Sequence, residues 1–264
     1  MLDVLTARST TRYRLGVKAV SLGRTIDPEG RARKLARGLQ AAKAAGANHV
    51  VISGDLTELG EPREFEHFAH VLSDAHIANE NITLVPGNHD AYTSRDSWKS
   101  AMTGPLAAWS TTSAGEPGRM VDRGHVVFLP IDTSCYQSIA RSGGAFSHDA
   151  ADIVERRAAD PGLRDKAVVL VLHHPPITSD KNPLWQWIDG LRGRSRIVDL
   201  LMKHTHVQLL HGHMHKVVDR VLGLGKARAR IFGAPAIVDD HDAPRVRLYD
   251  IKDGALESTG MFAM

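Results

Sequence analysis

Four short clusters of histidine, aspartate and asparagine hold most of the reactive chemistry that the sequence offers. They are Gly54-Asp55, Gly87-Asn88-His89-Asp90, His173-His174-Pro175-Pro176 and Gly212-His213-Met214-His215. Each cluster alone has a purely structural explanation, because Gly-Asp pairs often form turns and Asn or Asp often caps a helix. Each one, however, directly follows a short aliphatic run. Four such coincidences together indicate one functional site.

The clusters together offer oxygen and nitrogen ligands for divalent metal ions. Asp55 carries two oxygens and can bridge two cations, Asn88 adds a neutral oxygen, and His173 adds a nitrogen. Alternate residues of a strand point to the same side, so we expect His213 and His215 to face one site. Mixed nitrogen and oxygen ligation suits Zn, Fe, Mn, Co or Ni better than Mg or Ca.

The elements that must position these clusters alternate between strand and helix in the first part of the chain. Apolar periodicity predicts helices over 29–45, 62–76, 148–159 and 196–204. Short aliphatic runs predict strands over 15–22, 49–52, 82–85, 126–131, 167–172 and 207–210, followed by strands over 216–222, 229–232, 245–251 and 256–262. Polar clusters just after the carboxyl ends of strands are typical of sites in open α/β sheets.

Length and composition predict one globular domain over residues 1–264, with residues 1–14 as a frayed tail. The 264 residues are 42% hydrophobic and 24% charged, without a composition shift or internal repeat. The longest purely apolar run, 167–172, is far too short to span a membrane, and the N-terminus lacks the pattern of a secretory signal.

The net charge and the cysteine count indicate which kinds of partner and which cellular compartment to expect. The formal net charge of +3 is too small to indicate a nucleic-acid partner, so we expect a small-molecule ligand. Cys135 is the only cysteine, which excludes an intrachain disulfide and fits the cytoplasm. The oligomeric state is not indicated by the sequence.

The order of the clusters resembles a known family. Gly-Asp, Gly-Asn-His-Asp, His-x-Pro and Gly-His-x-His are similar to motifs two to five of the calcineurin-like metallophosphoesterases, over about Val50 to His215. Ile131-Asp132-Thr133, followed by Gly144 and a helix after Ser147, resembles the bacterial cyclic-nucleotide-phosphodiesterase-like branch. The resemblance implies an α/β fold with four α-β-β-α layers, in which two mixed sheets pack face to face between helices.

The resemblance also implies which residues bind metal. Asp55 would bridge two ions, Asn88, His173 and His213 would complete one site, and His215 would belong to the other. The ions would be Mn, Fe or Zn, two in the family and either one or two here.

The same resemblance implies two catalytic residues, His89 and Asp90. His89 would face the substrate phosphate and either stabilise the transition state or protonate the leaving group, and Asp90 would orient His89. His173 stands two residues before Pro175, as in His-x-Pro, and is therefore preferred as the ligand over His174, which would support it.

The first motif of that family, Asp-x-His after the first strand, is missing. Aligning Leu22-Gly23-Arg24 with the residues that follow the motif places Ala19 and Ser21 where Asp and His should stand. The second metal site would then keep only Asp55 and His215. Three explanations are open. The N-terminal segment is altered or misread, the protein is a natural one-metal or inactive relative, or a carboxylate substitutes, such as Asp27, Asp239 or Asp242.

The expected function is hydrolysis of a phosphate ester by a metal-bound hydroxide. A diester is preferred to a monoester, and a 3′,5′-cyclic nucleotide is the first named candidate. One alternative is a non-catalytic one-metal relative that acts as a binding protein, and another is a phosphomonoesterase or pyrophosphatase on a nucleotide or lipid-linked substrate. Trp185 and Trp187, between the last two motifs, would either pack or form a lid over the substrate.

Overall fold

The computed structural model describes residue 18 and residues 26–178, 182–223, 228–238 and 245–263. The helices longer than one turn are α3 (Pro28–Ala44), α4 (Pro62–Asp74), α5 (Ser97–Thr103), α6 (His148–Ala158), α7 (Pro183–Asp189) and α8 (Arg194–Lys203). The strands are β1 (Val50–Ile52), β2 (Ile82–Leu84), β3 (Val121–Asp122), β4 (Val126–Pro130), β5 (Gly144–Ala145), β6 (Ala167–Val171), β7 (Leu191–Arg192), β8 (Val207–His211), β9 (Val218–Leu222), β10 (Ala229–Gly233), β11 (Arg245–Lys252) and β12 (Ala255–Ala263).

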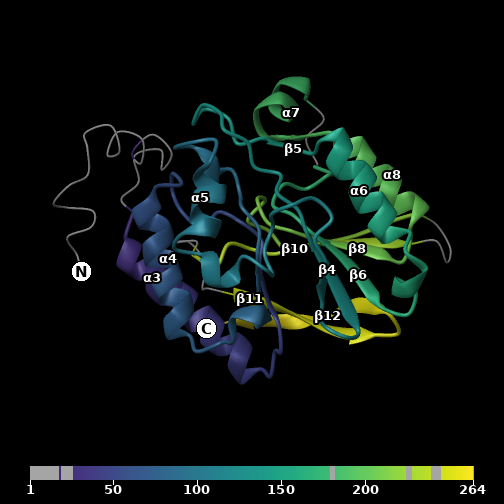
Figure 1. Ribbon diagram of the computed structural model, residues 1–264, viewed down its shortest axis with the longest axis horizontal. Coiled ribbons are helices and arrows are strands. Elements are labelled where there is room, and N and C mark those ends of the chain that lie inside the picture. The colour runs from purple at the N-terminus through teal and green to yellow at the C-terminus, as the bar shows by residue number, and fades with distance from the viewer. Residues whose placement is uncertain (1–17, 19–25, 179–181, 224–227, 239–244, 264) are drawn as a thin grey trace.

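A six-stranded mixed sheet lies at the centre of the molecule (Figure 1). Its strand order is β3-β4-β6-β8-β10-β9. The four inner strands β4, β6, β8 and β10 are parallel, whereas β3 and β9 pair antiparallel at the edges. The carboxyl ends of β6 and β8 therefore lie side by side, which brings together the histidine clusters that follow them.

Both faces of this sheet are buried. In β6, Val168 and Leu170 pack in one apolar cluster with Ile197 of α8, while Val169 and Val171 pack in a second cluster on the other face. Alternate residues of a strand point to opposite faces, so a strand covered on both sides must be apolar throughout. This explains the continuous apolar runs that predicted β4 and β6. In β8 the buried Gln208 is an exception, and its side chain hydrogen-bonds to the backbone of Leu256.

The elements form four layers (Figure 1). Helices α6 and α8 cover one face of the six-stranded sheet. On the other face lie the parallel pair β1-β2 and the antiparallel hairpin β11-β12, with α3, α4 and α5 outside them. The predicted α-β-β-α architecture is confirmed. The strand predicted over 15–22 and the tail predicted over 1–14 lie outside the described residues, and the single domain over 1–264 stays a prediction.

Local capping signals explain where the predicted helices begin. Asp27 accepts a hydrogen bond from the Gly30 N–H at 2.9 Å at the start of α3, and Ser147 does the same for the Ala150 N–H at the start of α6 at 3.2 Å. The predicted helices over 29–45, 62–76, 148–159 and 196–204 are confirmed within two residues at each end.

Two helices were not expected from the sequence. Helices α5 and α7 have seven residues each, too few for apolar periodicity to be distinctive. None of the residues of α7 is buried, so it has no apolar face to recognise. No helix within the described part of the chain is both long and apolar enough to cross a membrane.

Candidate metal centre

The four clusters meet at the ends of strands. Asp55 follows β1, Asn88 follows β2, His173 follows β6 and His213 follows β8. Because β1 and β2 are parallel neighbours, and β6 and β8 are too, each sheet brings two clusters to one edge. The packing of the sheets then brings the two edges together.

Three of the predicted ligands converge within hydrogen-bond distance. His173 Nε2 lies 3.2 Å from Asp55 Oδ2 and 3.2 Å from His213 Nδ1. Two ligand atoms bound at about 2.1 Å to one tetrahedral zinc ion lie roughly 3.4 Å apart. The observed separations are therefore close to the distance between two ligand atoms on one metal ion.

Hydrogen bonds behind each ring fix the orientation of His173 and His213. His173 Nδ1 lies 2.7 Å from the Ser53 carbonyl oxygen, and His213 Nε2 lies 2.8 Å from Asp189 Oδ1. Both partners are acceptors, so each of these ring nitrogens carries the proton. His173 Nε2 and His213 Nδ1 face the site and would supply the lone pairs that metal ligation requires.

Asn88 gives the clearest test of whether these residues fit a metal ion. The side chain is 2% exposed, and its Nδ2 donates to Tyr92 Oη at 2.8 Å, while Tyr92 donates to the Arg141 carbonyl at 2.9 Å. Asn88 Oδ1 is buried and makes no hydrogen bond with any described residue. A buried carbonyl oxygen without a partner is costly, and a cation would remove that cost. The donor set therefore fits a divalent metal.

His174 differs from its two histidine neighbours. It lies close enough to His173 and His213 for the three to hold one ion. However, its Nδ1 lies 2.8 Å from Thr133 Oγ1 and its Nε2 lies 3.0 Å from the Ser142 carbonyl, so both nitrogens are already engaged. Burial, with the nearby His173 and His213, lowers the pKa of His174 well below its usual value. This geometry supports His173 as the ligand and His174 as its neutral neighbour.

Backbone conformation at the site is unusual. Asp55, His213 and His215 have φ angles of 56°, 65° and 51°, in the left-handed region that non-glycine residues rarely adopt. Gly54 has φ of 104°, and a Cβ there would lie 2.3 Å from His173 Nδ1. Glycine is therefore required before Asp55.

The expected geometry of the last cluster needs correction. Strand β8 ends at His211, so His213 and His215 do not share a strand face. They lie in the turn that follows, and left-handed backbone rather than strand alternation directs their side chains. His215 is exposed. Both histidines line the same cavity as Asp55, His89 and His173.

His89 lies beside Asp55. Its backbone N–H donates to Asp55 Oδ1 at 3.1 Å, and its Nδ1 lies 3.0 Å from the Glu58 carbonyl oxygen. The Glu58 carbonyl thus takes the role that was expected of Asp90, because it fixes the ring and leaves Nε2 directed elsewhere. Burial raises the pKa of Asp55, but its electrostatic interactions with His173 and His89 and its hydrogen bond with His173 outweigh burial and hold the pKa well below its usual value.

Asp90 links two loops instead of orienting His89. The fully buried carboxylate accepts hydrogen bonds from the Gly87 N–H at 2.8 Å, the Thr57 N–H at 2.9 Å, the Thr57 hydroxyl at 2.8 Å and the Leu56 N–H at 3.2 Å. Burial and the charge of Asp55 raise its pKa to about 6, against the lowering effect of these hydrogen bonds. Asp90 therefore ties the loop after β1 to the loop after β2.

Several groups at the site had no signal in the sequence. Asp189 contacts His213, Tyr92 contacts Asn88, and Ser142 contacts His174. Thr133, which also contacts His174, had a signal only as part of the Ile131-Asp132-Thr133 segment. Ser142 donates from its hydroxyl to Asp189 and accepts from His174 at its carbonyl. Only Tyr92, four residues after Asn88, lies near enough in sequence to have been suspected. The others come from distant segments.

The missing first motif cannot be located in the structure. Ala19, Ser21 and the substitute candidates Asp239 and Asp242 lie outside the described residues. Asp27 is described, and its carboxylate caps α3 and lies 3.5 Å from Arg33. Its oxygens therefore already have helix-capping and ion-pair partners.

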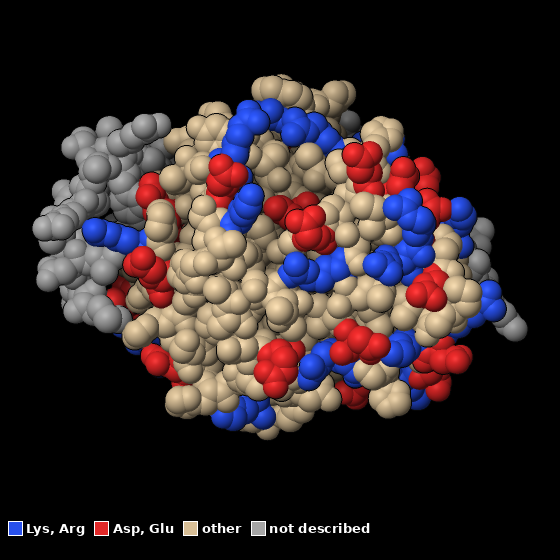
Figure 2. Space-filling view, in the orientation of Figure 1, with Lys and Arg blue, Asp and Glu red and all other residues tan. Residues whose placement is uncertain are grey.

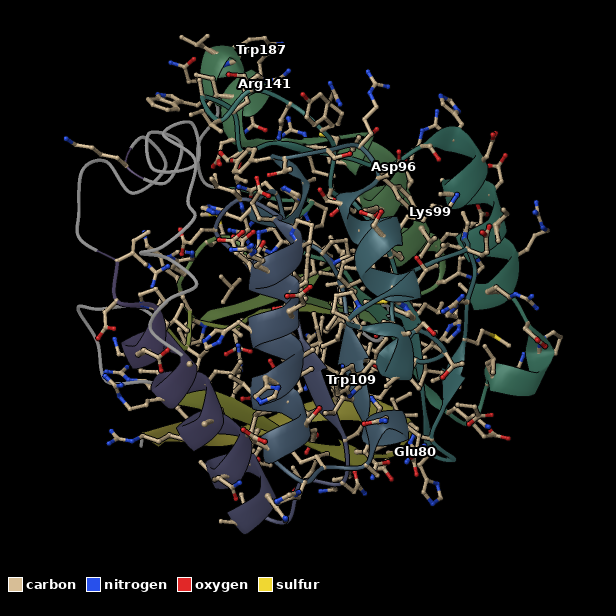
Figure 3. The ribbon with its side chains drawn as sticks, turned by 60° about the vertical axis from the view of Figure 1, so that its left-hand side comes forward. Glu80, Asp96, Lys99, Trp109, Arg141 and Trp187 are labelled. Atoms are coloured by element: carbon tan, nitrogen blue, oxygen red, sulfur yellow. The ribbon has the colours of Figure 1, made fainter. Side chains whose placement is uncertain are left out.

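Helix α7 presents exposed aromatic side chains next to the site. Trp185 and Trp187 are 53% and 58% exposed, so neither packs in the core. The Arg141 guanidinium lies 4.1 Å from the Trp187 ring centroid and also donates to the Trp187 carbonyl at 2.9 Å (Figure 3). Figure 2 shows the surface hollowed beneath α7, with Lys and Arg side chains along the upper rim of the hollow. The basic upper rim favours anionic ligands, while Asp and Glu side chains lie at the left and lower edges of the same hollow.

Comparisons with known proteins agree with this geometry. The family model described as calcineurin-like phosphoesterase matches residues 27–217. A 3′,5′-cyclic-nucleotide phosphodiesterase of Nostoc sp. is 24% identical over 170 residues, which cover 63% of this chain and 55% of that protein. The chain thus spans about half the length of this curated relative.

A solved structure shares the fold. The purple acid phosphatase PPD1 from seeds of yellow lupin (Lupinus luteus) superposes with a TM-score of 0.51 at 10% sequence identity. The superposition covers 78% of this chain and 38% of the lupin chain.

Proposed function

The chain belongs to the calcineurin-like phosphoesterase family, a family of phosphoester hydrolases, and we propose that it hydrolyses a phosphodiester at the centre around Asp55. One observation carries the proposal. His173 Nε2 lies 3.2 Å from both Asp55 Oδ2 and His213 Nδ1, while the buried Asn88 Oδ1 has no partner among the described residues. This arrangement serves a cation and has no other evident use.

Asp55, Asn88, His173 and His213 would hold one divalent ion, and Asp55 and His215 would contribute to a second. Zn, Fe or Mn suits this mixture of nitrogen and oxygen donors. When bound, such ions neutralise charge on the phosphoryl oxygens and activate the attacking water. With Ala19 and Ser21 at the first motif, we expect this chain to bind the first ion much more tightly than the second.

His89 would act directly on the substrate. The Glu58 carbonyl accepts from its Nδ1–H, so Nε2 is free for the phosphate. In the protonated ring, Nε2–H donates to a phosphoryl oxygen or gives its proton to the leaving oxygen. The hydrogen bond from the His89 N–H to Asp55 Oδ1 keeps the ring beside the metal ligands.

A 3′,5′-cyclic nucleotide is the proposed substrate class. The Nostoc relative is named for that activity, although it is much longer than this chain. Positive charge at the rim beneath α7 suits an anionic phosphodiester.

A second candidate is a one-metal binding protein without turnover. The residues at positions 19 and 21 favour it, because Ala has no donor atom and Ser is a poor ligand. The retention of His89, whose ring is oriented at Nδ1 by the Glu58 carbonyl, favours the enzyme.

The test compares this chain with the double variant Ala19→Asp/Ser21→His. Metal content and hydrolysis of bis(p-nitrophenyl) phosphate with added Mn²⁺ are measured for both, with p-nitrophenyl phosphate as the monoester comparison. We expect about one ion per chain and slow diester hydrolysis, rising in the double variant. Equal metal content and turnover in both proteins would contradict the interpretation of the first strand. Absence of metal and hydrolysis in both would refute the proposed function.

A further inference from the structure

We propose that Asp189, at the end of α7, is a positioning residue for the metal ligand His213. Its carboxylate holds the proton on His213 Nε2, so that Nδ1 presents its lone pair to the ion. The inference rests on the proposed metal centre and adds to it a residue outside the four motifs.

The contact is short and largely shielded. Asp189 Oδ1 lies 2.8 Å from His213 Nε2, and the His213 side chain is 7% exposed. An ionised carboxylate only accepts hydrogen bonds, so it selects the tautomer with the proton on Nε2. His213 Nδ1 then turns its lone pair toward His173 Nε2, 3.2 Å away.

The ring nitrogens of His173 and His213 that point away from the site bond to different kinds of acceptor. The Ser53 carbonyl orients His173, and that main-chain acceptor is present whatever the side chain at position 53. His213 depends on a side chain from a distant segment. Substitution can therefore separate the positioning of His213 from that of His173.

Contacts from the segment Arg141 to Gly143 hold the Asp189 carboxylate and its neighbours in place. The Ser142 hydroxyl donates to Oδ1, and the backbone N–H groups of Ser142 and Gly143 donate to the Ile188 carbonyl at 3.0 and 2.9 Å. Arg141 holds Trp187 on the same helix. Asp189 is thus fixed by main-chain hydrogen bonds to the neighbouring residue, so its own removal should leave α7 in position.

The first measurement is zinc affinity. The metal-free protein is titrated with Zn²⁺ in competition with a chromophoric chelator, for the parent chain, Asp189→Ala, Asp189→Asn and the control Asp152→Ala. Asp152 is an exposed acid on α6. We expect Asp189→Ala to lose about ten- to a hundredfold in affinity, as is usual when the partner of a ligating histidine is removed. Asp189→Asn keeps an acceptor oxygen and should recover much of the loss, while the control should match the parent.

The second measurement is the tautomer of His213 in the metal-free protein, from ring ¹⁵N chemical shifts assigned with His213→Gln. The parent should show Nε2–H, and Asp189→Ala should show a mixture. Parental zinc affinity together with the parental tautomer in Asp189→Ala would overturn the proposal. If the parent binds no zinc, the proposed function fails, whereas the tautomer still decides the role of Asp189. If Asp189→Ala does not fold, Asp189→Leu, which also removes both acceptor oxygens, decides by the same tautomer measurement.

Discussion

Individual residues at the centre divide into those that would bind the ion and those that orient them. Asn88, His173 and His213 each leave one donor atom facing the site, because another atom of the same side chain is held from behind. Those hydrogen bonds restrict the rotation of the three side chains before the ion binds. Such preorganisation increases affinity because less entropy is lost on binding.

Among single residues at the site, we expect Gly54 to tolerate substitution least. Gly54→Ala places a Cβ 2.3 Å from His173 Nδ1 and forces φ near 104°. Gly46→Ala is the matched control, because Gly46 has φ of 78° but nothing within 4 Å of the added Cβ. We expect the control to lose about 1–2 kcal/mol of unfolding free energy from backbone strain alone.

The Gly54→Ala variant should lose more than its control in urea unfolding and also bind Zn²⁺ at least tenfold more weakly, because His173 must move. Gly46→Ala should bind Zn²⁺ as the parent does. Equal loss of stability in the two variants, with zinc affinity retained in both, would show that the loop adapts to the added methyl.

Helices and strands contribute to the site unequally. The ends of β1, β2, β6 and β8 supply the ligands, whereas α7 and the loop before β5 supply the groups behind them. Helices α6 and α8 support the opposite face of the six-stranded sheet and contact none of the proposed ligands in the hydrogen bonds of the described chain. Stability and metal binding should therefore respond differently to changes in different elements.

Removing a cap from α6 should lower stability without affecting the metal centre. Ser147 Oγ accepts from the Ala150 N–H at 3.2 Å, so Ser147→Ala leaves a helix N–H without that partner. We expect a loss of about 1 kcal/mol of unfolding free energy in urea, with unchanged zinc affinity. In Ser73→Ala, the control on α4, the lost bond goes to the Ala69 carbonyl within the helix, so stability should stay the same or rise slightly. A loss in Ser73→Ala as large as that in Ser147→Ala would contradict the capping explanation.

The whole molecule places its metal centre between two layers of strands. Asp55 and Asn88 follow the pair β1-β2, while His173 and His213 follow the six-stranded sheet. An ion held by all four residues would cross-link the layers. Its binding free energy would then add to the stability of the fold as a whole.

Zinc should accordingly raise the melting temperature. At a free concentration of about 100 times Kd, a ligand that binds only the folded state adds roughly 2.7 kcal/mol. We expect an increase of several degrees in calorimetry with Zn²⁺, reversal by EDTA, and no increase in Asn88→Ala, which removes the Oδ1 that no described residue satisfies. A zinc-independent melting temperature in the parent would argue against the four-residue centre.

The local sequence pattern by itself determined the buried strands and most of the proposed metal ligands. The apolar runs of β4 and β6 predicted buried strands, because a strand covered on both faces is mostly apolar, and the clusters after β6 and β8 predicted ligands. Only the tertiary structure decided which groups stand behind those ligands. Asp189 lies 24 residues from His213 in the chain, and Thr133 lies 41 residues from His174. The tertiary structure also decided the turn at His213 and the hydrogen bond between Asp90 and Thr57. Such contacts depend on how distant loops pack, so they leave no periodic pattern in the sequence.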